Sequence, residues 1–146
     1  MFNKILVVCV GNICRSPMGE YLLKARASEA DAGVTVASAG IGALVGHGAD
    51  PLAVEVMGEH GIDIEAHRAQ QLTSELVKHY ELILVMEQWQ QEEIERLYPY
   101  ARGRVHLLGK WGKEEISDPY KKPKAFFTEA YEKIDRACQE WSNKLW

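Results

Sequence analysis

The sequence has no excess of basic residues, few cysteines and no long hydrophobic run. Its 146 residues include 17 Lys and Arg against 21 Asp and Glu, a formal net charge of −4, so nonspecific binding to nucleic-acid phosphates is not expected. Three cysteines are too few, and odd in number, for a secreted disulfide framework, which predicts free thiols in the reducing cytoplasm. No run reaches the roughly 18 apolar residues of a membrane span, so membrane insertion is not expected. The apolar run at 5–10 is also too short for a signal peptide.

The chain shows no linker, repeat or charge run that would mark a domain boundary. A length of 146 residues suits one globular unit, so we expect a single domain over 1–146. Short apolar runs alternate with segments of helical spacing, which is typical of an α/β fold with buried parallel strands. The expected strands are 4–10, 34–38, 81–86 and 104–108, and the expected helices are 17–29, 51–60, 73–79, 88–97 and a last one from about Pro123.

The first and last helices also show which of their faces pack inward. In the first, Ser16 suits the cap position and Pro17 the first helical position, and Met18, Leu22 and Ala25 are predicted to face the core. In the last, apolar residues recur at spacings of three and four and form one continuous face, made of Phe127, Ala130, Tyr131, Ile134, Cys138, Trp141 and Leu145. We interpret this face as core packing rather than a cofactor-binding stripe, with Cys138 as a buried small hydrophobe.

Residues 9–16 carry the pattern most suggestive of chemistry, a Cys-x5-Arg followed by Ser between an expected strand and an expected helix. A tight turn at Gly11 would point successive backbone N–H groups inward, and the helix N-terminus adds partial positive charge, so the loop can hold a tetrahedral oxyanion. Arg15 adds a planar fork that binds two oxygens at once. The same field favours the thiolate form of Cys9, which is the nucleophilic form.

The pattern Cys-x5-Arg also occurs by chance, and a cysteine that ends a buried strand is usually inert filler. Two further features favour catalysis. Gly11 and Ser16-Pro17 suit a loop that passes from a strand into a helix, and ligands in open parallel sheets bind beyond the carboxyl ends of the strands. We therefore interpret the loop as a catalytic anion site.

The segment CVGNICRSP (9–17) resembles the phosphate-binding loop of the low-molecular-weight protein tyrosine phosphatases. The similarity continues in family order along nearly the whole chain, with SAG at 38–40, HRAQQL at 67–72, ELILVME at 81–87 and SDPY at 117–120. The stretch GALVGHGADP (42–51) is similar to the bacterial branch that acts on tyrosine autokinases of capsule and exopolysaccharide export. The resemblance implies an open four-stranded parallel sheet flanked by helices on both faces, with the phosphate-binding loop after the first strand.

The resemblance also implies a role for each matched position in catalysis. Cys9 would be the nucleophile, Arg15 would bind the phosphate, and Asp118 would be the general acid. Attack by Cys9 would form a phosphocysteine, which water then hydrolyses with Asp118 acting as base. Arg15 and the backbone dipoles would supply the stabilising charge, so no metal or other cofactor is expected. The five histidines show no ligand-like spacing among themselves or with the cysteines.

Other matched positions would bind the substrate or support the loop. Ser16 would donate a hydrogen bond to the Cys9 sulfur, and Asn12 would hold the loop in shape through contacts with Ser38 and His67. The remaining substrate-binding positions would be Val10, Gly11, Ile13 and Cys14 in the loop and Tyr120 as an aromatic wall for the phenyl ring. Cys14 is also the nearest thiol that could resolve an oxidised Cys9 as a disulfide.

Each of these supporting roles has a simpler alternative. Ser16 also suits a helix cap, and Ser38 and His67 could be ordinary satisfied polar residues. Asp118 precedes a proline, which is a common turn signal, and Cys14 could simply pack beneath the loop.

At two positions the sequence departs from its relatives. Glu87 stands where many of them have Asp, which we expect to leave the scaffold intact. Lys121 follows Tyr120 where eukaryotic members often have a second aromatic residue, which bears on the preference for particular phosphotyrosine contexts.

Two other functions fit parts of the same sequence. An arsenate reductase on this scaffold would need further cysteines near the third strand, but 72–109 contains none. A phosphotyrosine-binding module or inactive relative would not need Cys9, Arg15 and Asp118 together. We therefore expect a monomeric phosphatase whose partner is a phosphotyrosine protein, namely a membrane tyrosine autokinase.

Overall fold

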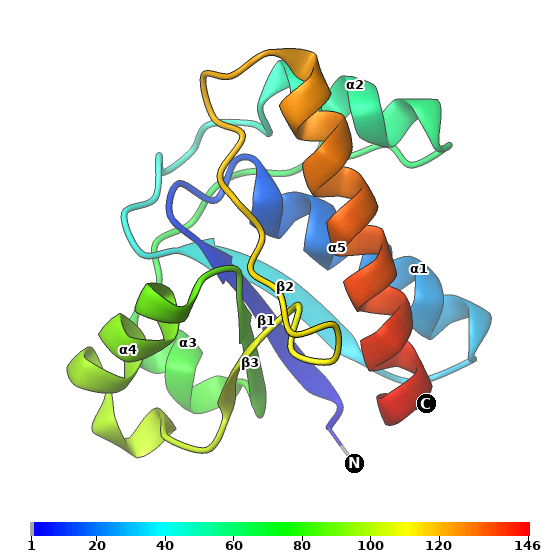
Figure 1. Ribbon diagram of the computed structural model, residues 1–146. Helices are drawn as coiled ribbons and strands as arrows, with labels where there is room; N and C mark the ends of the chain where they lie inside the picture. Colours follow the sequence, from blue (N-terminus) through cyan, green and yellow to red (C-terminus); the bar gives the residue numbers. More distant parts are fainter. Residues whose placement is uncertain (1) are drawn as a thin grey trace.

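The computed structural model describes residues 2–146 and is built around one parallel sheet (Figure 1). Its strands are β1 (Lys4–Cys9), β2 (Thr35–Gly40), β3 (Leu82–Val85) and β4 (Val105–Leu107). They lie in the order β2-β1-β3-β4, and each neighbouring pair is parallel. The expected strands are therefore all present, although their ends shift by one or two residues.

Alternate side chains of the strands enter two separate hydrophobic clusters, one on each face of the sheet. Ile5 and Val7 of β1 belong to the larger cluster, and Leu6 and Val8 belong to the smaller one. All four are fully buried. The sheet is thus covered on both faces, which explains why its strands read as continuous apolar runs rather than as an alternating pattern.

Helices on both sides of the sheet complete the two clusters. The helices are α1 (Arg15–Glu29), α2 (Pro51–Glu59), α3 (Ser74–His79), α4 (Gln88–Leu97) and α5 (Lys124–Leu145), with a short 3-10 helix η1 (Pro99–Ala101). Residues of α1, α2 and α5 fill the larger cluster, and residues of α3, α4 and η1 fill the smaller one, as the two groups of helices in Figure 1 show. The expected α/β architecture is confirmed.

The long helix α5 packs through the face that its spacing predicts. Six of its seven predicted core residues are buried, among them Cys138, and Leu145 is partly buried against the same cluster. Trp141 donates an Nε1–H hydrogen bond to the carbonyl of Leu108 at 2.7 Å. In α1 the prediction was partly wrong, because Leu23 is fully buried while Ala25 is only half-buried.

The topology places the carboxyl end of β1 in the middle of the sheet edge at which ligands bind in such folds. β1 lies between β2 and β3, and its carboxyl end runs directly into residues 10–14, which lead into α1. In open parallel sheets ligands bind at such a point, where the strand order reverses. Among residues 2–146, no helix is long and apolar enough to cross a membrane.

Candidate active site

The loop between β1 and α1 curls around a concave surface formed by its own backbone. Its left-handed residue is Asn12, with φ of 59°, and not Gly11. A Cβ on Gly11 would meet only ordinary contacts, so the turn expected at Gly11 does not require a glycine there. Asparagine tolerates this conformation better than most residues.

The glycine that the loop requires lies instead on the neighbouring strand. A Cβ on Gly40 would come within 2.4 Å of the Val10 carbonyl oxygen and 3.0 Å of the Asn12 nitrogen. Gly40 pairs with Cys9 at the end of β2. Only a residue without a side chain lets β2 approach the loop this closely.

Arg15 is almost fully buried beneath the loop, and its guanidinium is held from one side. Its Nη1 donates to Glu87 Oε2 at 3.0 Å and to the Ile116 carbonyl at 2.7 Å. Its Nη2 lies 3.7 Å from Asp118 Oδ2. Among the described residues its buried Nε has no hydrogen-bond partner. The guanidinium is therefore fixed in direction, while its Nε–H and the hydrogens of Nη2 remain available for an anion.

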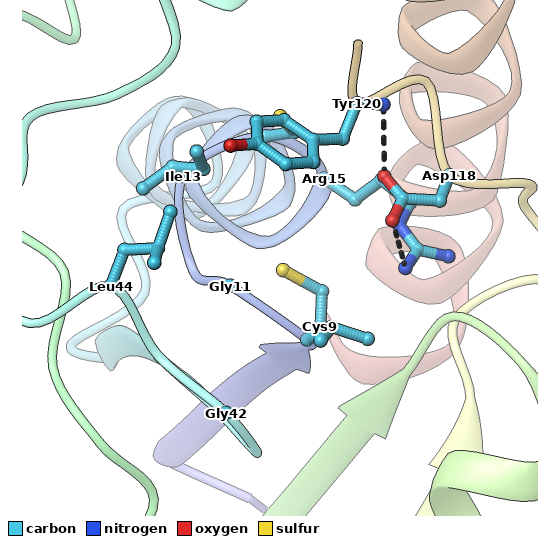
Figure 2. A pocket seen from close by; sticks show the side chains of 10 residues that line it. Cys9, Gly11, Ile13, Arg15, Gly42, Leu44, Asp118 and Tyr120 are labelled. Atoms are coloured by element: carbon cyan, nitrogen blue, oxygen red, sulfur yellow. Dashed lines mark hydrogen bonds and ion pairs between the residues drawn. The ribbon is translucent and has the colours of Figure 1, made fainter.

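A cavity of about 160 Å³ opens over this loop (Figure 2). It is lined by Cys9, Val10, Gly11, Ile13, Cys14, Arg15, Gly42, Leu44, Asp118 and Tyr120. The Asp118 carboxylate is half-exposed, and its Oδ1 accepts from the Tyr120 backbone N–H at 3.0 Å. Segments far apart in the chain thus bring a thiol, a guanidinium, a carboxylate and an aromatic ring to one cavity.

Ser16 faces the thiol rather than capping α1. Its Oγ lies 2.9 Å from the Cys9 Sγ and accepts from Asn12 Nδ2 at 2.7 Å. α1 begins at Arg15 with Cys14 in the cap position, and no side chain caps it. The predicted capping role of Ser16 is therefore wrong, because its hydroxyl is already engaged by the thiol and the amide.

Ser38 and His67 both contact Asn12, as the resemblance implies. Asn12 Nδ2 donates to Ser38 Oγ at 3.0 Å, and His67 Nε2 lies 2.7 Å from the Asn12 carbonyl oxygen. Both side chains are buried.

Some residues at the site were not predicted from the sequence. Leu44 lies on the cavity rim within the segment 42–51. Glu87 holds the Arg15 guanidinium, a role that its place directly after a buried strand could have suggested. Glu20 is buried against Ser38, and the sequence carries no signal that predicts this contact.

Cys14 is a buried thiol on the same cavity. Burial raises its pKa, the negative charges of Asp50, Cys9 and Asp118 add to this effect, and Arg15 opposes it. A group with a raised pKa gains thiolate only as the pH rises. Resolution of a Cys9 sulfenic acid by Cys14 should therefore be slow at neutral pH and accelerate about tenfold per pH unit between about pH 6 and 8.

This prediction can be checked by mass spectrometry of the Cys9–Cys14 disulfide after a peroxide pulse at several pH values. Cys14→Ser should then recover less activity with dithiothreitol than the wild type, because Cys9 can proceed to irreversible oxidation. Cys138→Ser is the matched control, since Cys138 is fully buried on α5. Equal recovery in wild type and Cys14→Ser would show that Cys14 only packs beneath the loop.

The family model for low molecular weight phosphotyrosine protein phosphatases matches residues 4–146. The chain belongs to this family. The phosphatase is 52% identical over 145 residues to the probable low molecular weight protein-tyrosine-phosphatase EpsP of Ralstonia nicotianae, covering 99% of this chain and 97% of EpsP. The family expected from the loop is thus confirmed, and the enzyme is a protein-tyrosine phosphatase.

Solved structures agree with the fold of this phosphatase. Wzb of Vibrio vulnificus in complex with benzylphosphonate superposes with a TM-score of 0.94 at 49% identity, covering 99% of this chain and 100% of Wzb. The YwlE arginine phosphatase of Geobacillus stearothermophilus is more distant in sequence, with a TM-score of 0.90 at 30% identity and coverage of 99% and 93%. The same scaffold therefore carries enzymes with different phosphorylated substrates.

Proposed function

We propose that this phosphatase hydrolyses phosphotyrosine through a phosphocysteine intermediate formed on Cys9. The Cys9 sulfur attacks phosphorus as the bond to the tyrosine oxygen breaks, and Asp118 gives its proton to the departing phenolate. Cys9 and Asp118 line the same cavity from the loop and from the segment before α5, which supports this division of roles.

The second step reverses the role of Asp118. Its carboxylate takes a proton from water as the water oxygen attacks phosphorus, the S–P bond breaks, and phosphate and the Cys9 thiolate are released. No outside oxidant, reductant or donor is needed, because the proton that Asp118 loses in the first step returns in the second.

The observation that carries this proposal is the incomplete hydrogen bonding of the Arg15 guanidinium. Its Nη1 is engaged by Glu87 and Ile116, whereas its buried Nε has no partner among the described residues. A buried donor without a partner is costly, and a phosphate oxygen in the loop would satisfy it. Arg15 and the backbone N–H groups would together stabilise the charge on the transferring phosphoryl group without a metal ion.

The rim of the cavity favours an aryl phosphate over other phosphate esters. Ile13, Leu44 and Tyr120 surround the opening, and apolar and aromatic side chains suit the faces of a phenyl ring. Cys9 and Arg15 are buried, so a phosphoserine is too short to reach them, while a phosphotyrosine ring can span the rim. The benzylphosphonate in the structure of the related Wzb also joins a phosphonate to a phenyl ring, through one CH2 group.

We infer that the physiological substrate is a tyrosine-phosphorylated autokinase of exopolysaccharide or capsule export, met in the cytoplasm. The similarity to EpsP and Wzb supports this branch of the family. Lys121 lies beside the rim, with its Nζ 5.5 Å from the centre of the Tyr120 ring, and would favour acidic sequences around the phosphotyrosine. A monomer with one catalytic domain over 1–146 suffices for this reaction.

A panel of phosphopeptides tests the proposed substrate class. In buffer with EDTA, a phosphotyrosine peptide from an autokinase tail should be hydrolysed at least about a hundredfold faster, by kcat/KM, than the matched phosphoserine peptide. A phosphoarginine peptide should also be a poorer substrate, because the apolar side chains of Ile13 and Leu44 at the rim suit a phenyl ring better than a charged guanidinium. A preference for phosphoarginine would overturn the proposed substrate class, and dependence on added metal would overturn the proposed charge stabilisation.

A further inference from the structure

We propose that Glu20 is a positioning residue for the nucleophile, acting through Ser38, Asn12 and Ser16. This inference rests on the proposed role of Cys9. Glu20 lies on α1 and is mostly buried, at 8% exposed. Its Oε1 accepts from the Ser38 hydroxyl at 2.6 Å, and the hydrogen bonds continue from Ser38 to the sulfur of Cys9.

The orientation of the Asn12 side chain determines the direction of the hydrogen bonds in the middle of this network. Its Oδ1 lies 2.9 Å from the backbone nitrogen of Gln70, which can only donate. The amide nitrogen of Asn12 must therefore face the two serines, and its two hydrogens go to Ser16 Oγ at 2.7 Å and Ser38 Oγ at 3.0 Å. Both hydroxyls accept from Asn12, so each has its own hydrogen left to donate.

The two free hydroxyl hydrogens then have one acceptor each. Ser38 donates to Glu20, which as a carboxylate can only accept. Ser16 donates to Cys9, and a hydrogen bond to the sulfur favours the thiolate. A hydroxyl that donates to a charged acceptor becomes a better acceptor itself. Glu20 thus strengthens the hydrogen bond that Ser38 accepts from the Asn12 amide. The amide in turn orients the Ser16 hydroxyl towards the thiolate.

Lys24 forms an ion pair with the buried carboxylate of Glu20. Its Nζ lies 2.6 Å from Glu20 Oε2, one turn along α1, and its side chain is 45% exposed. The carboxylate therefore uses one oxygen for the ammonium and the other for Ser38. His67 is the titratable group that contacts Asn12 from the other side, at the backbone carbonyl, and Arg15, Asp118 and Cys14 face Cys9 across the cavity.

Glu20→Gln tests this role with almost no change in shape. The neutral amide is a weaker acceptor for Ser38. Its NH2 group must face either Lys24 or Ser38, both of which donate to Glu20, so one of the two hydrogen bonds is lost. We expect kcat/KM to fall about tenfold and the midpoint of the pH profile for iodoacetamide alkylation of Cys9 to move upward by about half a pH unit. Removing a negative charge near the thiolate would by itself move that midpoint downward, so the sign of the shift separates the two effects.

A double-mutant cycle shows whether Glu20 acts through Ser38. In a Ser38→Ala background, Glu20→Gln should cause little further change in kcat/KM or in the alkylation midpoint. Glu29→Gln is the matched control, because Glu29 is an exposed acid on the same helix, and it should leave both quantities unchanged. Thermal unfolding of each variant establishes that folded protein is compared.

Three results would overturn the proposal: an unchanged midpoint, a midpoint shifted to lower pH, or additive effects of the two substitutions. Cys9→Ser is measured alongside as a test of the underlying mechanism. If Cys9→Ser keeps its activity, the role of Cys9 itself is wrong. If Cys9→Ser is inactive and Glu20→Gln equals the wild type, only the role of Glu20 fails.

Discussion

Cys9→Ser is expected to lower turnover by at least about a thousandfold while the protein still binds inorganic phosphate. The serine hydroxyl is a poorly ionised group, so it cannot attack phosphorus as the thiolate does. The anion site remains, because the N–H groups of the loop and the Arg15 guanidinium do not depend on the sulfur. Steady-state assays with p-nitrophenyl phosphate and calorimetric titration with phosphate measure the two quantities separately.

The same exchange at a second buried cysteine provides the control. Cys138 lies on α5 with its Sγ 3.8 Å from the Gly19 carbonyl oxygen, and it is not among the residues that line the cavity. Cys138→Ser should keep the activity of the folded protein, since nothing at the cavity changes. Activity above about a hundredth of wild type in Cys9→Ser would contradict the role of Cys9 as nucleophile.

Most of the fold could be predicted because its signals are local. A buried parallel strand reads as an apolar run, and a helix on the sheet reads as a repeat of three and four. The ends of the elements were less predictable, because they depend on partners. β2 extends to Gly40 because Gly40 pairs with Cys9, and α1 begins at Arg15 because Ser16 is engaged by the thiol and by Asn12.

In the candidate site, too, the local features could be predicted and the contacts between distant residues could not. The loop 9–16 is continuous in sequence, so its residue types and spacing could be interpreted directly. Three supporting contacts could not, because each joins residues far apart in the chain. Glu20 meets Ser38 across 18 positions, Gln70 meets Asn12 across 58, and Glu87 meets Arg15 across 72. Only the packed sheet brings these polar groups together, and burial then makes their hydrogen bonds necessary.

Asp118→Asn is expected to slow hydrolysis of phosphotyrosine by about a hundredfold. Hydrolysis of p-nitrophenyl phosphate should slow by only about tenfold. The phenol of tyrosine has a pKa near 10 and needs a proton as it leaves, whereas p-nitrophenolate is a far weaker base and can leave unprotonated. The substitution preserves the turn, because an asparagine oxygen can still accept from the Tyr120 N–H that now lies 3.0 Å from Asp118 Oδ1.

The comparison must use kcat/KM, which reports on all steps up to the first irreversible one and so includes departure of the leaving group. If hydrolysis of the phosphocysteine limits kcat, the effect of the leaving group is hidden there. Asp63→Asn is the matched control. Asp63 is exposed, and its Oδ1 accepts from the backbone N–H two residues ahead at 2.8 Å, which is the contact that Asp118 makes. It should leave kcat/KM for both substrates unchanged.

Equal losses on the two substrates would mean that Asp118 shapes the loop or binds substrate, and that another group protonates the phenolate. Glu87 is the other carboxylate near Arg15, but its Oε2 already accepts from Arg15 at 3.0 Å and from Trp89 Nε1 at 3.1 Å. In Asp118, by contrast, no hydrogen bond within the described chain reaches Oδ2, which lies 3.7 Å from Arg15 Nη2. A proton on Glu87 would weaken the charged pair that orients the guanidinium, whereas a proton on Asp118 Oδ2 displaces no hydrogen bond. The difference between the two substrates should therefore depend on Asp118.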